Sequence, residues 1–90
     1  MEKLEKYTNI TKKALDKIKF CNPTKTHLDI ITKDYYNMAK TYYEDSIHFK
    51  KNGDYINAFA ALNYAHGWLD AGARIGLFDV DHDNVLFTVD

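Results

Sequence analysis

The sequence predicts an all-α protein, folded as a three-helix up-and-down antiparallel bundle with a short extended C-terminal tail. Two breaks, at residues 22–23 and 52–54, divide the chain ahead of its last dozen residues into three long segments. Apolar residues recur in each segment at spacings of three and four, which is the period of an amphipathic α-helix. Three such helices with short connections pack antiparallel around one core. We therefore expect a bundle domain over residues 1–78 and an acidic tail over residues 79–90, extended or folded as a small hairpin.

The first helix is expected over about residues 2–20. Its seam combines apolar and small side chains at alternating spacings of three and four: Leu4, Tyr7, Thr11, Ala14 and Ile18. Pro23 disfavours the helical conformation for the residue before it, so this helix should end ahead of Asn22.

The second helix is expected over about residues 26–52 and opens with the capping pattern Thr26-His27-Leu28-Asp29. Gly53 suits the left-handed position that ends a helix, and Asp54 suits the N-cap of the helix that follows. The expected seam of the second helix consists of Leu28, Ile31, Tyr35, Met38, Tyr42 and Phe49, with Asp45 as its one polar member.

The third helix is expected over about residues 54–77. At 100° per residue, apolar side chains cover more than half of its circumference, which is too much for one neighbour and suits two. Gly67 and Gly72 each cost about 1 kcal/mol relative to alanine in a helix interior, a cost that close packing or a binding site could offset. The main apolar strip of this helix consists of Ala58, Leu62, Ala65, Leu69, Ala73 and Gly76.

One narrow polar line on the third helix is the first candidate for chemistry. It consists of Asn63, His66, Asp70 and Arg74. The i,i+4 spacing lets Asp70 orient the imidazole of His66, and a bound anion could meet Arg74 and a protonated His66. His66 with Asp70 could also begin a metal site, but zinc needs three or four ligands. The line is therefore a hydrogen-bonded structural feature, a surface that captures the tail, or a ligand site.

Alternating aspartates in the tail partly match a calcium-binding loop. Asp79, Asp81 and Asp83 offer oxygen ligands at odd positions, as a hard cation requires. Asn84 stands where that loop needs glycine, however, and no second helix follows. We expect no metal and no cofactor, and we expect the tail to bury Leu86 or Phe87 in a groove of the bundle or to form the hairpin.

Aromatic residues at the helix edges are the candidate interface. Tyrosine doublets at residues 35–36 and 42–43 place one ring of each pair on the seam and the other near the edge. Edge tyrosines are common in protein interfaces, but they also pack between neighbouring helices, which is the interpretation we favour for these doublets. The candidate interface residues are Tyr36, Tyr43, Tyr64 and Trp68.

Charge and composition exclude several classes of protein. The chain has 12 basic and 13 acidic residues and a pI of 6.4, whereas nucleic-acid domains usually have a high pI and a clustered basic face. Nucleic-acid binding through the first-helix lysines, Lys12, Lys13, Lys17 and Lys19, is therefore only a weak alternative. A single cysteine, Cys21, cannot form an internal disulfide. With no apolar N-terminal segment and no run long enough to span a membrane, we expect a cytoplasmic protein.

A string in the third helix resembles a known family. The residues are Gly53-Asp54-Tyr55, followed by Ala61-Leu62-Asn63-Tyr64-Ala65-His66-Gly67-Trp68-Leu69-Asp70-Ala71-Gly72-Ala73-Arg74-Ile75-Gly76. They resemble small archaeal proteins catalogued as domain of unknown function 357, and the likeness extends over nearly the whole chain. The resemblance implies a three-helix up-and-down bundle. It implies no reaction and brings no functional residues.

The sequence thus favours a non-enzymatic interaction or self-association module, whose partner is a second copy or another protein. The motivation is the surplus apolar surface of the third helix together with the edge aromatics. The alternative is a small-ligand, anion or metal-binding protein that uses the polar line.

Overall fold

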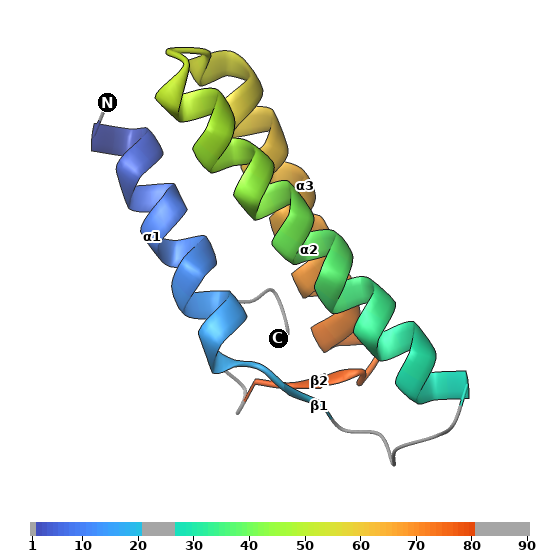
Figure 1. The fold of residues 1–90 in the computed structure, drawn as a ribbon. Coiled ribbons are helices and arrows are strands. Elements are labelled where there is room, and N and C mark those ends of the chain that lie inside the picture. The colour runs from blue at the N-terminus through green and yellow to red at the C-terminus, as the bar shows by residue number, and fades with distance from the viewer. Residues whose placement is uncertain (1, 21–26, 81–90) are drawn as a thin grey trace.

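The computed structural model describes residues 2–20 and 27–80 and contains three helices and two short strands (Figure 1). Helices α1 and α3 run in one direction and α2 runs in the opposite direction, with α3 behind α2 and α1 to one side of this pair in the view of Figure 1. The predicted all-α three-helix bundle is confirmed, with a small two-stranded sheet at one end. In order, the elements are α1 (Glu2–Lys17), β1 (Lys19–Phe20), α2 (His27–Lys51), α3 (Tyr55–Arg74) and β2 (Phe78–Asp79).

α1 ends at Lys17, three residues earlier than the sequence predicted, because the chain beyond it forms β1. β1 pairs antiparallel with β2, with Lys19 opposite Asp79 and Phe20 opposite Phe78. The Phe20 ring also stacks on the Phe78 ring, with centroids 6.0 Å apart. A strand partner 58 residues further along the chain therefore overrides the local helical pattern.

The turn between α2 and α3 follows the prediction for Gly53 and Asp54. Gly53 adopts a φ of +74°, and the N–H of Asp54 donates to the carbonyl of Phe49 at 2.9 Å. This hydrogen bond and the positive φ define the glycine-terminated end of α2. The Asp54 carboxylate then accepts the backbone N–H of Asn57 at 3.2 Å and caps α3.

α3 ends in the same way, at Arg74 rather than at residue 77. Gly76 has a φ of +82°, and the N–H of Leu77 donates to the carbonyl of Gly72 at 2.8 Å. The prediction that Gly76 belongs to the apolar strip of the helix is wrong, because the residue reverses the chain. This reversal lays the Phe78 ring against Gly72, where a Cβ atom would overlap the ring.

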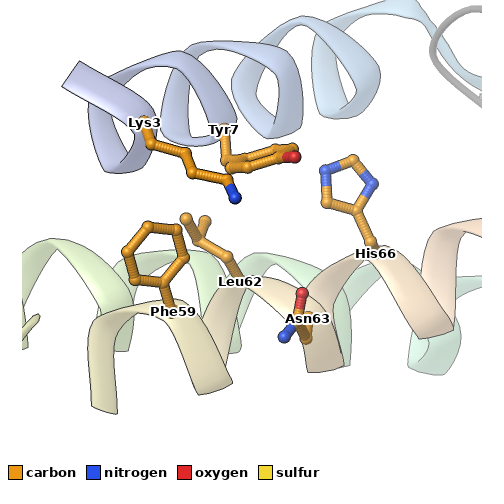
Figure 2. Close-up of a pocket in the computed structure, with 6 residues that line it drawn as sticks. All are labelled: Lys3, Tyr7, Phe59, Leu62, Asn63 and His66. Atoms are coloured by element: carbon orange, nitrogen blue, oxygen red, sulfur yellow. The ribbon is translucent and has the colours of Figure 1, made fainter. Parts of the chain in front are cut away.

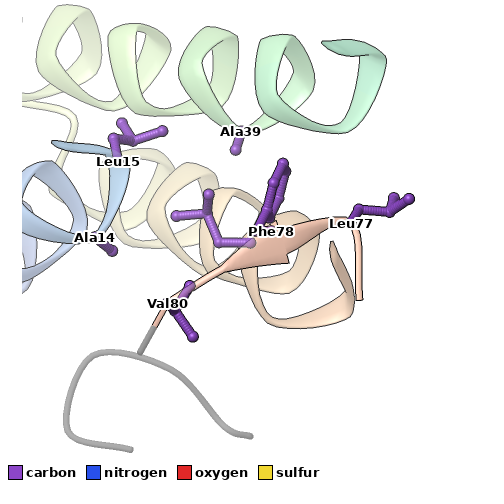
Figure 3. Packing of buried hydrophobic residues seen from close by; sticks show 7 residues of the cluster. Ala14, Leu15, Ala39, Leu77, Phe78 and Val80 are labelled. Atoms are coloured by element: carbon purple, nitrogen blue, oxygen red, sulfur yellow. The ribbon is translucent and has the colours of Figure 1, made fainter. Parts of the chain in front are cut away.

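Within residues 2–20 and 27–80, the core contains two apolar clusters. One lies at the sheet end of the bundle (Figure 3) and contains Ala14, Leu15, Ala39, Leu69, Leu77, Phe78 and Val80. The other cluster contains Leu4, Ala58 and Leu62. α3 contributes to both clusters and contacts both other helices, as its wide apolar surface predicted.

The expected seam of α2 is rotated relative to the observed one. Ile31 is 41% exposed, while the residues buried along α2 are Asp29, Thr32, Ala39 and Ser46. These smaller side chains let α3 approach closely, and the Ser46 hydroxyl donates to the carbonyl of Ala58 at 2.8 Å. The bulky aromatics that the sequence placed on the seam flank it instead.

Two expectations fall on parts of the chain that are not described. The predicted tail spans residues 79–90, of which residues 81–90 are not described, and Cys21 also lies outside the described residues. Among the helices at residues 2–17, 27–51 and 55–74, none combines the length and apolar character required to cross a membrane.

Candidate functional site

His66, in the polar line of α3, faces α1, whereas Asn63 and Arg74 of the same line are exposed. The Nε2 atom of His66 lies 2.6 Å from the Thr11 hydroxyl oxygen. That hydroxyl donates its proton to the carbonyl of Tyr7 at 2.9 Å, so it accepts the N–H of His66 Nε2. His66 therefore holds α3 to the middle of α1, between the two apolar clusters.

Burial controls the charge of His66. Desolvation lowers the pKa of its imidazole below the ordinary value of 6.5, and the neighbouring Asp70 opposes this shift in part. The fold thus favours the neutral imidazole, which brings no positive charge to an anion.

The four residues of the polar line do not share one site. Asn63 and His66 line a cavity between α1 and α3, whereas Asp70 and Arg74 are not among the lining residues. Arg74 is exposed at the last position of α3.

The calcium hypothesis extends beyond the described residues. Asp79 is exposed in β2, while Asp81 and Asp83 are not described. Within residues 2–20 and 27–80, no group of three or more histidine, cysteine or acidic side chains could hold a metal ion.

The cavity has a volume of about 480 Å³ and lies between the first half of α1 and the middle of α3 (Figure 2). α1 directs two of its side chains toward α3 there, and α3 supplies the others from below. The rings of Tyr7 and Phe59 meet edge to face, with centroids 6.2 Å apart and planes at 72°. The lining residues are Lys3, Tyr7, Phe59, Leu62, Asn63 and His66.

Sequence reasoning missed the contributions of Lys3, Tyr7 and Phe59 to this cavity. Lys3 and Tyr7 stand at i,i+4, as do Phe59 and Asn63, so each pair lies on one helix face. That spacing was the available signal, but it does not say which faces of two different helices meet.

The four candidate interface residues separate into two pairs. Tyr36 and Tyr43 are half-buried and pack against the core cluster at the sheet end. Tyr36 also meets Phe20 edge to face at 5.7 Å. Burial, and to a smaller extent the negative charge of Asp16 on α1, raises the pKa of Tyr43 above its ordinary value.

Tyr64 is exposed on α3, whereas Trp68 is half-buried and packs against the same core cluster as Tyr36 and Tyr43. Both meet the other members of the tyrosine doublets. Tyr64 stacks on Tyr42 with ring centroids 5.2 Å apart, and Trp68 meets Tyr35 edge to face at 4.9 Å. We call this surface the outer aromatic strip. Its residues are Ile31, Tyr35, Met38 and Tyr42 on α2, Tyr64 and Trp68 on α3, and Ile75 directly after α3.

Comparison with known proteins gives one result. A family model described as a protein of unknown function (DUF357) matches residues 6–78. No curated protein and no solved structure gives a significant match.

Proposed function

The chain belongs to the DUF357 family, whose function is unknown, and we propose that it is a non-enzymatic module that self-associates through the outer aromatic strip. The observation that supports the proposal is the exposure of three of the seven residues of this strip, whose other four residues are half-buried. Tyr64 and Ile75 are each 62% exposed, and Ile31 is 41% exposed. Clustered apolar surface of this kind marks interaction sites on soluble proteins.

The strip is continuous across two helices. On α2, Ile31, Tyr35, Met38 and Tyr42 follow one another at spacings of three and four, so they share one face. The two ring contacts join this face to α3. The pair α2 and α3 makes the most extensive helix contact of the fold, so the strip lies on a rigid base. A rigid base lowers the entropy lost on binding.

The composition of the strip favours a second copy as the partner. None of its seven residues is charged, so a two-fold pairing brings no like charges together at its centre. The acids nearest in helical spacing, Asp34 and Asp45, both stand on α2. Pairing α2 of one copy with α3 of the other keeps the two sets of acids apart, and isologous two-fold dimers are the commonest oligomers.

The test is the mass in solution, measured by light scattering over a range of concentrations. The wild-type protein should approach twice the chain mass of 10.5 kDa as concentration rises. Tyr64→Glu should remain at the monomer mass, because it places a charge in the centre of the strip. Tyr64 is largely exposed, so the fold should tolerate this change.

The matched control is Ile56→Glu. Ile56 is also on α3 and is 84% exposed, but it lies outside the strip. This variant should dimerise like the wild type. A wild-type protein that stays monomeric at millimolar concentration, or a Tyr64→Glu variant that still dimerises, would contradict the proposal.

A further inference from the structure

The cavity between α1 and α3 combines an apolar floor with polar groups at its rim. Leu62 is buried beneath it, and the rings of Tyr7 and Phe59 form an aromatic wall. Its volume of about 480 Å³ falls in the range of small-molecule sites. The cavity therefore has room for a planar apolar body of two fused rings.

The polar groups at the rim are available to a ligand. In Figure 2 the side chain of Lys3 extends toward α3, and the hydroxyl end of Tyr7 is turned toward the His66 ring. Among the described residues, neither the Lys3 ammonium nor the Asn63 carboxamide has a hydrogen-bond or ion-pair partner in the protein. Both groups are exposed, so water solvates them until a ligand arrives.

The charge of the lining residues determines whether a ligand should be an anion or a cation. Lys3 is the one cation among the six lining residues, and none of the six is acidic. The His66 Nε2 proton is already committed to Thr11. The Lys3 ammonium suits a carboxylate, which accepts a charge-assisted hydrogen bond from it. The Asn63 carboxamide, which also lines the cavity, can turn its N–H group to donate a second one.

We propose that this cavity binds a small aromatic carboxylate, with its rings against Leu62, Tyr7 and Phe59 and its carboxylate at Lys3 and Asn63. The site lies between α1 and α3, whereas the outer aromatic strip joins α2 and α3. Binding therefore does not depend on self-association, and dimers and monomers should both take up the ligand.

The test adds naphthalene-2-carboxylate as the probe to the full chain and measures the amide chemical shifts of the protein. The probe should shift the signals of residues that line the cavity and leave those of the outer aromatic strip unchanged. Naphthalene-2-carboxamide has the same rings without the charge and should bind at least about tenfold more weakly.

Three variants locate the carboxylate. Lys3→Met keeps the apolar stem and removes the charge, so it should weaken binding of the carboxylate about tenfold or more. Asn63→Asp adds a negative charge at the exposed rim and should weaken it as well. The control is Lys12→Met, which removes another exposed α1 charge that does not line the cavity, and its affinity should match the wild type.

Several results would overturn the proposal. Wild-type spectra that do not change up to the solubility limit of the probe would show that the cavity takes no such ligand. Equal affinities for the carboxylate and the carboxamide, or for wild type and Lys3→Met, would exclude the assigned carboxylate position. Shifts confined to the outer aromatic strip would place binding elsewhere.

Discussion

The protonation state of His66 affects the contact that attaches α1 to α3. Its Nε2 atom hydrogen-bonds to Thr11 on α1, and burial of the ring lowers the pKa of the imidazole. Protonation of the ring in the folded state is therefore penalised, since a buried charge loses its hydration. The contact across the two helices is adapted to the neutral form.

Stability should consequently fall on the acid side of neutrality. In the unfolded chain His66 takes up a proton near its ordinary pKa of 6.5, whereas the folded chain takes it up only at lower pH. Between these two values the unfolded state binds more protons, so the free energy of unfolding decreases as the pH falls. Above about pH 6.5 the contribution is fully present.

Denaturant titrations at several pH values between about 5 and 7 would measure this slope. His66→Gln retains an N–H donor for Thr11 and does not titrate, so its free energy of unfolding should depend less on pH than that of the wild type. His48→Gln, at an exposed position on α2, controls for the loss of a histidine. Identical slopes for His66→Gln and the wild type would refute this prediction.

The four glycines have different roles in α2 and α3. Gly53 and Gly76 have positive φ and end α2 and α3. Gly72 is inside α3 and is required for a different reason, because the Phe78 ring occupies the space of its missing side chain. Gly67, also inside α3, has no atom within 4 Å of the position of an added Cβ.

Alanine substitutions at the two interior glycines should therefore have opposite effects. Gly67→Ala should raise the free energy of unfolding by up to about 1 kcal/mol, since alanine has the higher helix propensity. Gly72→Ala should lower it by about 1–3 kcal/mol, because displacing a buried ring costs more than the propensity gains. Chemical denaturation of both variants checks this, and stabilisation by Gly72→Ala would be incompatible with the position of Phe78.

At the scale of the molecule, α2 and α3 form a closely packed pair and α1 is attached to it less extensively. α1 is held by an apolar cluster around Leu4, by the hydrogen bond that His66 donates to Thr11, and by Ala14 and Leu15 in the cluster at the sheet end. The middle attachment is polar and the outer two are apolar. The cavity lies beside the polar attachment, where aliphatic side chains do not fill the interface.

Leu4→Ala should therefore lower the free energy of unfolding strongly, although Leu4 lies close to the start of α1. Leu4 is fully buried against Ala58 and Leu62, and truncation of a buried leucine costs about 2–5 kcal/mol. Leu4→Met keeps most of the volume and should cost less than about 1.5 kcal/mol. Thermal denaturation of the two variants measures the difference, and similar midpoints for both would mean that α1 contributes little to the fold.

The sequence by itself determined the number of helices, their approximate bounds and the caps between α2 and α3. These features depend on interactions between residues a few positions apart, as in the helical period and the turn at Gly53 and Asp54. It also identified the polar line that contains His66. Only the tertiary structure decided which way each helix is rotated, and so which side chains meet. Ile31 is exposed and Ala39 buried because the close approach of α3 selects small side chains. His66 faces Thr11 for a similar reason, since contacts between residues 55 positions apart depend on the packing of whole helices.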